Sequence, residues 1–176
     1  MMNINTALHH FLKPLLKKDF ISVDATCGNG NDTLFLVRNT KFTYAFDINP
    51  IAIDNTKARL KDFSNYKTIN KSHVYIKDEV LNADCIIFNL GYLPKVESPT
   101  ITNKETTIIA LNSAFSCLKT NGLLSISCYL KHDGGYDEYL AVVDWLKINN
   151  HNVIYTYQDQ SKDLAPILFV VKKECQ

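Results

Sequence analysis

The sequence predicts a doubly wound α/β fold, in which helices cover both faces of a mostly parallel sheet. Short runs rich in β-branched and aromatic residues alternate with single stretches of helical periodicity along the chain. Such alternation is typical of βαβ units with right-handed crossovers. With 176 residues and 46% apolar side chains, the chain has the size and composition of one domain with a sizeable core. We therefore expect a single domain over residues 1–176.

A helix is predicted at the start of the chain, over residues 1–18. Apolar residues from Leu8 to Leu16 recur there at helical spacing, after Asn5 and Thr6, either of which could cap the helix. Seven strands follow, the third of them weak, over residues 20–24, 42–47, 73–76, 83–89, 123–129, 153–158 and 167–171. Four further helices are predicted between them, over residues 32–38, 51–63, 104–118 and 136–148.

The last two predicted strands are joined by residues 159–166, which are too few for a crossover helix. These two strands must therefore form a hairpin and run antiparallel to each other. A dinucleotide-binding sheet continues with parallel strands. A seven-stranded, Rossmann-like sheet with an antiparallel last strand instead resembles the class I methyltransferases that use S-adenosylmethionine.

Charge and cysteine content exclude several classes of protein. The chain has 19 basic and 18 acidic residues, so self-repulsion does not keep it disordered. Only two basic residues are arginines, which argues against a broad arginine-rich surface that reads duplex grooves. The five cysteines form no C-x-x-C pair and support neither a disulfide framework nor a zinc site. Without an 18-residue apolar run or a leader pattern, we expect a cytoplasmic protein with no metal and no membrane partner.

A glycine loop follows the first predicted strand. Gly28 and Gly30 supply a G-x-G pattern where backbone can approach a ligand. A dinucleotide fingerprint would need a third glycine where Thr33 stands, and Asp32 places negative charge where a pyrophosphate would bind. S-adenosylmethionine suits this loop better, because Asp24 or Asp32 could meet its ammonium or sulfonium charge. The alternative is an ordinary turn in which Asp32 stabilises the helix N-terminus.

A further acidic residue, Asp47, ends the second predicted strand 19 residues after Gly28. That spacing is expected for a carboxylate that accepts hydrogen bonds from both ribose hydroxyls, although Asp47 could instead cap the helix near Pro50. Residues 70–73 lie before or at the start of the weak third strand and could either contact adenine or form a surface turn. The predicted cofactor-binding residues are Asp24, Cys27, Gly28, Asn29, Gly30, Asp32, Asp47, Ile48, Ser72, His73 and Asn89.

The fourth strand ends at Asn89, which is followed by Leu90, Gly91, Tyr92 and, two residues on, a proline. This resembles a variant of the N-P-P-Y signature of methyltransferases that act on nitrogen. In that signature the asparagine oxygen and the next carbonyl accept hydrogen bonds from the target amine, and the aromatic ring stacks on the base. Such acceptors orient the nitrogen lone pair toward the methyl group. The alternative is an asparagine in a turn beside a packed tyrosine.

A second polar cluster, residues 129–136, follows the fifth strand. Its glycines allow a loop over a substrate, and His132 could exchange a proton near neutral pH, although a solvated loop histidine is the alternative. The predicted catalytic residues are Asn89, Tyr92, Asp32 and His132. The predicted substrate-binding residues are Leu90, Gly91, Tyr92, Tyr129, Lys131, His132, Gly134, Gly135 and Tyr136, with the tyrosines as stacking faces.

Four segments together resemble a known family: residues 24–36, 88–94, 105–108 and 132–135. They are similar to the small bacterial proteins once grouped as rRNA methylases, the MnmM-type tRNA methyltransferases. The resemblance implies that residues 20–130 form the cofactor-binding and catalytic strands and that residues 131–176 form a substrate loop, a helix and the C-terminal hairpin. It also implies that the protein uses S-adenosylmethionine to methylate the 5-aminomethyl group of wobble 2-thiouridine in the tRNA anticodon stem-loop. Residues 95–98 depart from the family, which commonly has G-G-D-K or K-G-D-K there.

Other functions compete with this one. An rRNA or DNA amine is an alternative target, and a nicotinamide-dependent oxidoreductase or a non-catalytic RNA-binding domain is an alternative class. We expect the RNA to be held by Lys13, Lys17, Lys18 and Lys131. An exposed apolar face would indicate a homodimer.

Overall fold

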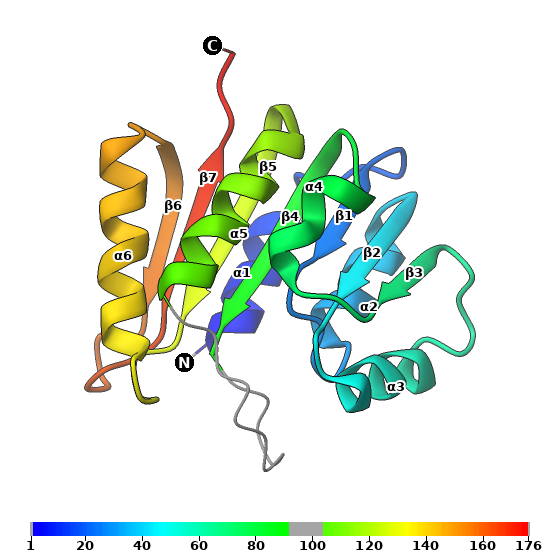
Figure 1. Cartoon of the computed structure of the whole chain (residues 1–176), viewed down its shortest axis with the longest axis horizontal. Coiled ribbons are helices and arrows are strands. Elements are labelled where there is room, and N and C mark those ends of the chain that lie inside the picture. Colours follow the sequence, from blue (N-terminus) through cyan, green and yellow to red (C-terminus); the bar gives the residue numbers. More distant parts are fainter. Residues whose placement is uncertain (1, 92–103, 176) are drawn as a thin grey trace.

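A seven-stranded sheet with the order β3-β2-β1-β4-β5-β7-β6 forms the centre of the protein (Figure 1). The computed structural model describes residues 2–91 and 104–175. The strands are β1 Ile21–Asp24, β2 Phe42–Phe46, β3 Tyr66–Ile69, β4 Ala83–Leu90, β5 Leu118–Cys128, β6 Asn152–Gln158 and β7 Ile167–Lys172. Strands β1 to β5 pair in parallel, whereas β7 is antiparallel to both β5 and β6. The predicted hairpin and mostly parallel sheet are therefore confirmed.

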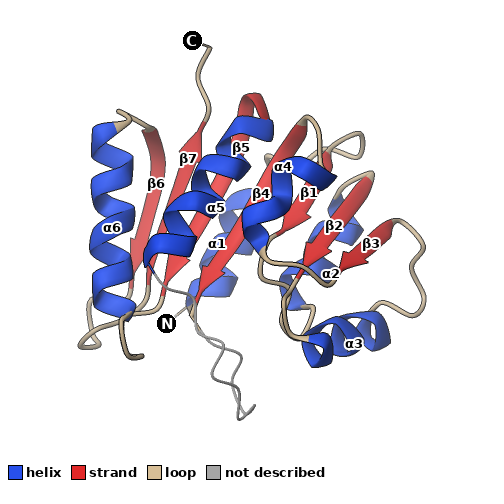
Figure 2. Ribbon diagram, viewed as in Figure 1, coloured by secondary structure: helices blue, strands red, loops and turns tan. Residues whose placement is uncertain are grey.

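Helices cover both faces of the sheet, as Figure 2 shows. The helices are α1 Ile4–Leu12, α2 Asn31–Asn39, α3 Pro50–Arg59, α4 Ile76–Glu79, α5 Lys104–Cys117 and α6 Gly135–Ile148, with a 3₁₀ turn, η1 His73–Tyr75. Helices α1 and α2 pack on one face, where Leu8, Leu36 and Ile87 belong to one buried cluster. Helices α5 and α6 pack on the other face around Leu111 and Val142. None of the described helices has both the length and the hydropathy of a membrane-spanning segment.

The third strand lies earlier in the chain than the sequence indicated. The prediction of a strand over residues 73–76 is wrong, because β3 is Tyr66–Ile69 and pairs with β2 at the edge of the sheet. Ser72 caps the following 3₁₀ turn by accepting a hydrogen bond from the amide of Val74. Residues 70–73 therefore follow the third strand instead of preceding it, at the same edge as the glycine loop.

The leading helix is shorter than predicted and covers Ile4–Leu12. Asn3 caps it, accepting a hydrogen bond from the amide of Thr6 at 2.8 Å. The helix ends before Pro14, which has no N–H to donate to the preceding turn. The amino end of α1 thus reaches the edge of the sheet where the strands β1, β4 and β5 end, close to Tyr129, whose hydroxyl donates to Asn5 at 3.2 Å.

Candidate active site

The glycine loop between β1 and α2 is held by α3. Gly28 and Gly30 have φ angles of 51° and 75°, in the left-handed region. A Cβ on Gly30 would lie 3.0 Å from the Cα of Thr56, so this glycine also allows a close approach to α3. Thr56 donates to the carbonyl of Gly28 at 3.2 Å, and Arg59 donates to the carbonyl of Asn29 at 2.5 Å. The loop is therefore a fixed backbone cradle and not merely a flexible turn.

Asp47 is bound to this loop. Its Oδ2 accepts from the amide of Gly28 at 3.0 Å, and its Oδ1 accepts from the amide of Asn49 at 2.9 Å. The cap of α3 is Asn49, whose side chain accepts from the amide of Ile51, so the alternative that Asp47 caps this helix is wrong. Burial raises the pKa of Asp47. Each carboxylate oxygen retains acceptor capacity for a ligand.

Asp24, at the end of β1, is fully buried. It accepts hydrogen bonds from the Thr33 hydroxyl at 2.6 Å and from the amide of Thr26 at 3.2 Å. Burial and the nearby charge of Asp32 raise the pKa of Asp24 to about 7. The Thr33 side chain thus occupies the position where a dinucleotide fingerprint requires glycine, which argues against a pyrophosphate site.

Asp32 connects α1 to the end of β4. The Asp32 side chain is 5% exposed and uses both oxygens: Oδ1 accepts from Nε2 of His9 at 2.5 Å, and Oδ2 accepts from Nδ2 of Asn89 at 2.5 Å. The ring of His9 stacks on Phe35, with centroids 4.0 Å apart and planes 6° apart. The structure therefore joins two predicted site residues to a histidine that the sequence analysis did not single out.

The amide of Asn89 has a defined orientation. Since its Nδ2 donates to the Asp32 carboxylate, its Oδ1 points elsewhere. Oδ1 is buried, and among residues 2–91 and 104–175 it has no hydrogen-bond partner. The backbone amide of Asn89 donates to the Thr26 hydroxyl at 2.8 Å, which fixes this strand end against the glycine loop. A buried carbonyl oxygen without a partner is costly, so it indicates a place for a donor from a ligand.

The predicted adenine side of the site lies after β3. His73 packs edge-on against Phe88, with ring centroids 5.7 Å apart, and burial lowers its pKa to about 4. Asn70 donates to the carbonyl of Asp47 at 2.9 Å. Ile48, the residue after Asp47, is 48% exposed. The Cys27 thiol is buried, and this burial raises its pKa. Apolar and neutral groups thus flank Asp47, which suits an uncharged aromatic ring.

The loop after β5 is built around His132 and α6. Nδ1 of His132 lies 3.0 Å from the carbonyl of Asp133, and its Nε2 lies 3.9 Å from Oε2 of the buried Glu138. A Cβ on Gly135 would lie 2.5 Å from the Tyr129 carbonyl, so only glycine fits there. The structure places His132 beside the first turn of α6, and its predicted role as a proton acceptor stays a prediction.

The other residues of this predicted loop differ in exposure: Lys131, Gly134 and Tyr136 are exposed, whereas Tyr129 is largely buried. Burial and the charge of Asp32 raise the pKa of Tyr129 to about 12, so this phenol stays neutral and able to donate. Leu90 and Gly91 follow Asn89, and the amide of Tyr129 donates to the Leu90 carbonyl at 3.2 Å. The predicted stacking residue Tyr92 lies outside the described residues, as do residues 95–98.

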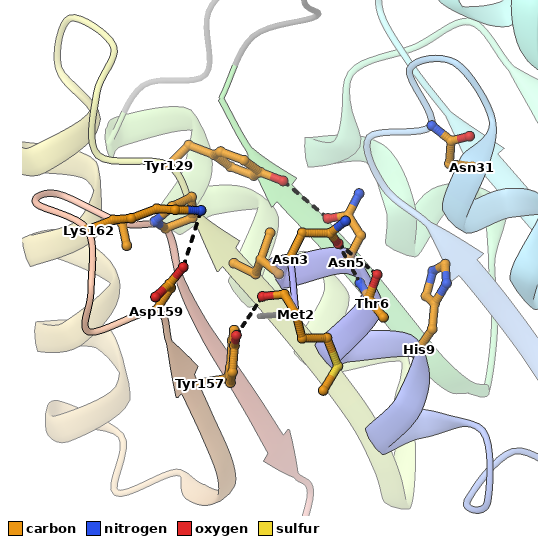
Figure 3. Close-up of a pocket in the computed structure, with 13 residues that line it drawn as sticks. Met2, Asn3, Asn5, Thr6, His9, Asn31, Tyr129, Tyr157, Asp159 and Lys162 are labelled. Atoms are coloured by element: carbon orange, nitrogen blue, oxygen red, sulfur yellow. Dashed lines mark hydrogen bonds and ion pairs between the residues drawn. The ribbon is translucent and has the colours of Figure 1, made fainter.

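A pocket of 560 Å³ adjoins this site (Figure 3). The Tyr129 hydroxyl points to Asn5 across it, and Tyr157 donates to the carbonyl of Met2 at 2.6 Å. Lys162 lies 3.2 Å from Asp159 on the hairpin side. The pocket is lined by Met2, Asn3, Ile4, Asn5, Thr6, His9, Asn31, Tyr129, Tyr157, Asp159, Lys162, Ala165 and Pro166. Its size is within the range of small-molecule sites, and its wall carries amide, hydroxyl and ammonium groups.

Three of the lysines expected to hold RNA lie far from the strand ends. Lys18 donates to the carbonyl of Arg38 at the end of α2, about 14 Å of helix from the glycine loop. Lys13 is the C-cap of α1, and Lys17 follows five residues after the end of that helix. The lysines nearer the site are Lys131 and Lys162. The pattern of apolar and polar residues in the sequence does not identify Lys162 or His9 as site residues, because their place near the site depends on how distant segments pack.

Comparisons with known proteins agree with this architecture. Residues 43–172 match the protein family described as "Putative rRNA methylase". A relative in Arabidopsis thaliana, the chloroplastic tRNA (mnm(5)s(2)U34)-methyltransferase, is 32% identical over 193 residues, which cover 94% of this chain and 68% of that protein. The chain belongs to the rRNA methylase family.

Two solved structures are similar to this rRNA methylase family member over nearly the whole chain. A "putative rRNA-methylase" from Clostridium thermocellum has 32% sequence identity and a TM-score of 0.90, and the match covers 98% of both chains. A "putative methyltransferase" from Streptococcus mutans, solved in complex with SAH, has 33% identity and a TM-score of 0.88, covering 98% of this chain and 99% of that one. The order of elements described above is therefore the fold of the family.

Proposed function

We propose that this protein is an S-adenosylmethionine-dependent tRNA methyltransferase that methylates the 5-aminomethyl group of 2-thiouridine at wobble position 34. The observation that carries the proposal is the buried Oδ1 of Asn89 at the end of β4, next to the glycine loop, which has no hydrogen-bond partner within the described part of the chain. The Arabidopsis relative is named for the nucleoside that this reaction yields. The anticodon stem-loop of tRNA is then the partner, and the cytoplasm its compartment.

The residues around the loop fit S-adenosylmethionine. Asp47 has acceptor capacity left for the two ribose hydroxyls, and Ile48, Ser72 and His73 would flank the adenine. The carboxylate of Asp32, and that of Asp24 once it ionises above its pKa of about 7, supply negative charge for the ammonium and sulfonium groups. Gly28, Asn29, Gly30 and Cys27 supply the loop backbone. When bound, this cofactor supplies an electrophilic methyl group on a positively charged sulfur.

Asn89 orients the target amine in this proposal. Its Oδ1 accepts an N–H of the amine, which directs the nitrogen lone pair away from the asparagine and toward the methyl group. Being neutral, the amide does this without stabilising the ammonium form, as a carboxylate would. Tyr92 would stack on the base, and Leu90 and Gly91 would contribute backbone acceptors.

In this proposal, the target nucleoside binds in the pocket beside the site. Its 560 Å³ can hold a nucleoside, and its hydroxyl and amide groups can bind base edges and ribose. Lys162 and Lys131 add positive charge for phosphates on the same side. Tyr129 lies between this pocket and the end of β4, because it bonds to Asn5 on one side and to Leu90 on the other.

The test is methylation by the purified protein, read by mass spectrometry of the nucleosides. We expect tRNA that carries 5-aminomethyl-2-thiouridine to be converted to the 5-methylaminomethyl form when S-adenosylmethionine is present. tRNA that lacks the aminomethyl group serves as the control, and ribosomal RNA tests the alternative target. Methylation of rRNA but not of this tRNA would overturn the proposed substrate and leave the methyltransferase assignment in place.

A further inference from the structure

The strongest unassigned feature is the contact between α1 and the end of β4 through Asp32. His9 comes from the leading helix, outside residues 43–172 that match the family description. Its Nε2 donates to Oδ1 of Asp32 at 2.5 Å, and the other oxygen of Asp32 accepts from Asn89 at 2.5 Å. One buried carboxylate thus links a histidine to the amide that faces the substrate in the proposed function.

The position of His9 is well defined. Its ring lies parallel to Phe35 of α2, with centroids 4.0 Å apart, so the ring plane is fixed. Two other residues of α1 hold the helix in place. Leu8 is fully buried against the sheet, and the side chain of Asn5 accepts a hydrogen bond from the Tyr129 hydroxyl. The His9 side chain remains 29% exposed, so one side of the ring faces solvent.

The ionic state of Asp32 decides which atom Asn89 presents. An ionised Asp32 can only accept, so it binds Nδ2 of Asn89 and leaves Oδ1 for the substrate. A protonated Asp32 could donate to Oδ1 of Asn89, and the amide would then turn and present N–H groups. An amide turned in this way has no acceptor for an amine N–H.

His9 holds Asp32 in place for this contact. Nε2 of His9 lies 2.5 Å from Oδ1 of Asp32, while Oδ2 of the same carboxylate faces Nδ2 of Asn89 at 2.5 Å. The two contacts together fix the plane of the carboxylate and thus the side from which it meets the Asn89 amide. Without the donor on His9, the buried Oδ1 of Asp32 would also lack the hydrogen-bond partner that it has in the structure.

We propose that His9 is a positioning residue for the methyl-transfer reaction: through Asp32 it holds the Asn89 amide with its oxygen toward the target amine. The inference rests on the proposed function for the identity of that amine. It requires no contact between His9 and the substrate. It predicts that the methylation rate depends on the N–H donor of His9 and not on the bulk of the side chain or on its stacking against Phe35.

A matched set of variants tests the role of the donor. His9→Phe keeps a ring on Phe35 but removes the N–H, whereas His9→Gln loses the ring and keeps an N–H of similar reach. We expect His9→Phe to lower the single-turnover methylation rate by about 10- to 100-fold, as misplacement of a reacting group does, with little change in the KM for tRNA. His9→Gln should recover most of the rate, and His10→Phe on the exposed neighbour should have no effect. Equal losses in His9→Phe and His9→Gln would overturn the proposal.

A double-mutant cycle separates positioning from general stability. If His9 acts through Asp32, adding His9→Phe to an Asp32→Asn background should cost no further rate. Multiplied losses in the double variant would contradict the inference. Urea unfolding of each variant checks that the fold is intact.

A spectroscopic readout makes the inference independent of activity. In a ¹⁵N–¹H spectrum, the Asn89 side-chain amide is identified by its absence in Asn89→Ala. We expect this resonance to move in His9→Phe and to stay in place in His9→Gln, and an unmoved resonance in His9→Phe would overturn the inference. If the resonance responds as expected but the wild-type protein does not methylate the tRNA, the proposed substrate is wrong while the positioning role stands.

Discussion

Replacing Asp47 tests the cofactor site most directly, because this one carboxylate contacts the glycine loop and is also the proposed acceptor for the ribose. Asp47 binds the Gly28 and Asn49 amides and is proposed to accept the ribose hydroxyls. In Asp47→Ala the ribose loses its charge-assisted acceptor, which is worth about 1.5–3 kcal/mol. That loss corresponds to a roughly 10- to 150-fold rise in the Kd for S-adenosylmethionine. Isothermal titration calorimetry measures it directly.

Two further variants show where the loss comes from. Asp47→Asn keeps one oxygen acceptor without the charge, so its Kd should fall between those of the wild type and Asp47→Ala. Asn49→Ala removes the cap of α3 and should lower the free energy of unfolding by about 1 kcal/mol while the Kd stays unchanged. Wild-type affinity in Asp47→Ala would refute the ribose assignment, and equal loss in Asn49→Ala would show that only the order of α3 matters.

Three other predictions follow from the same geometry. Gly30→Ala and Gly134→Ala share the cost of positive φ, but only the first places a Cβ 3.0 Å from α3 backbone, so in urea it should be less stable than Gly134→Ala by about 1–3 kcal/mol. The native chain binds a proton at Asp24 up to a pKa of about 7, whereas the unfolded chain releases it near pH 3.8. The stability that this group contributes is therefore lost as pH rises from about 4 to 7, and Asp24→Asn should flatten that loss in unfolding curves. Lys162→Gln should weaken tRNA binding and reduce its salt slope by about 0.7, whereas Lys17→Gln should change neither; equal effects would place the RNA elsewhere.

The sequence predicted most of the fold because its strands are apolar runs bounded by turn residues. The hairpin of β6 and β7 followed from the shortness of residues 159–166 alone. The third strand was missed because Tyr66–Ile69 is a short edge strand in which only Ile69 is buried. Its assignment depends on pairing with β2, which no local pattern reveals.

The candidate site, like the fold, was predictable only where a local pattern identifies its residues. Gly28, Gly30 and Asp47 were identified from spacing, and the structure brings them into direct contact. His9 could not be identified, because it lies inside an amphipathic helix and acquires its meaning only when α1 packs beside Asp32. Its partner Phe35 likewise gave no signal. Contacts between helices on one face of a sheet depend on packing, and periodicity gives only which face is buried.

The central claim is that the oxygen of Asn89 orients a neutral amine for methyl transfer. An alkylamine has a pKa of about 10.4, so most of it is protonated at neutral pH and must lose that proton in the site. Asn89→Asp would place a second carboxyl beside Asp32, and this added negative charge favours the ammonium form. Ser127, the Cα partner of Asn89 in β5, offers a matched control.

Single-turnover methylation of tRNA carrying 5-aminomethyl-2-thiouridine, followed from about pH 6 to 9, tests this claim most directly. We expect Asn89→Ala to be slower by about 10²- to 10³-fold at every pH, as for the loss of a positioned transition-state contact. Asn89→Asp should lose most near neutral pH and partly recover as pH rises, while Ser127→Ala stays at the wild-type rate. A wild-type rate in Asn89→Ala would contradict the account and remove Asn89 from the reaction.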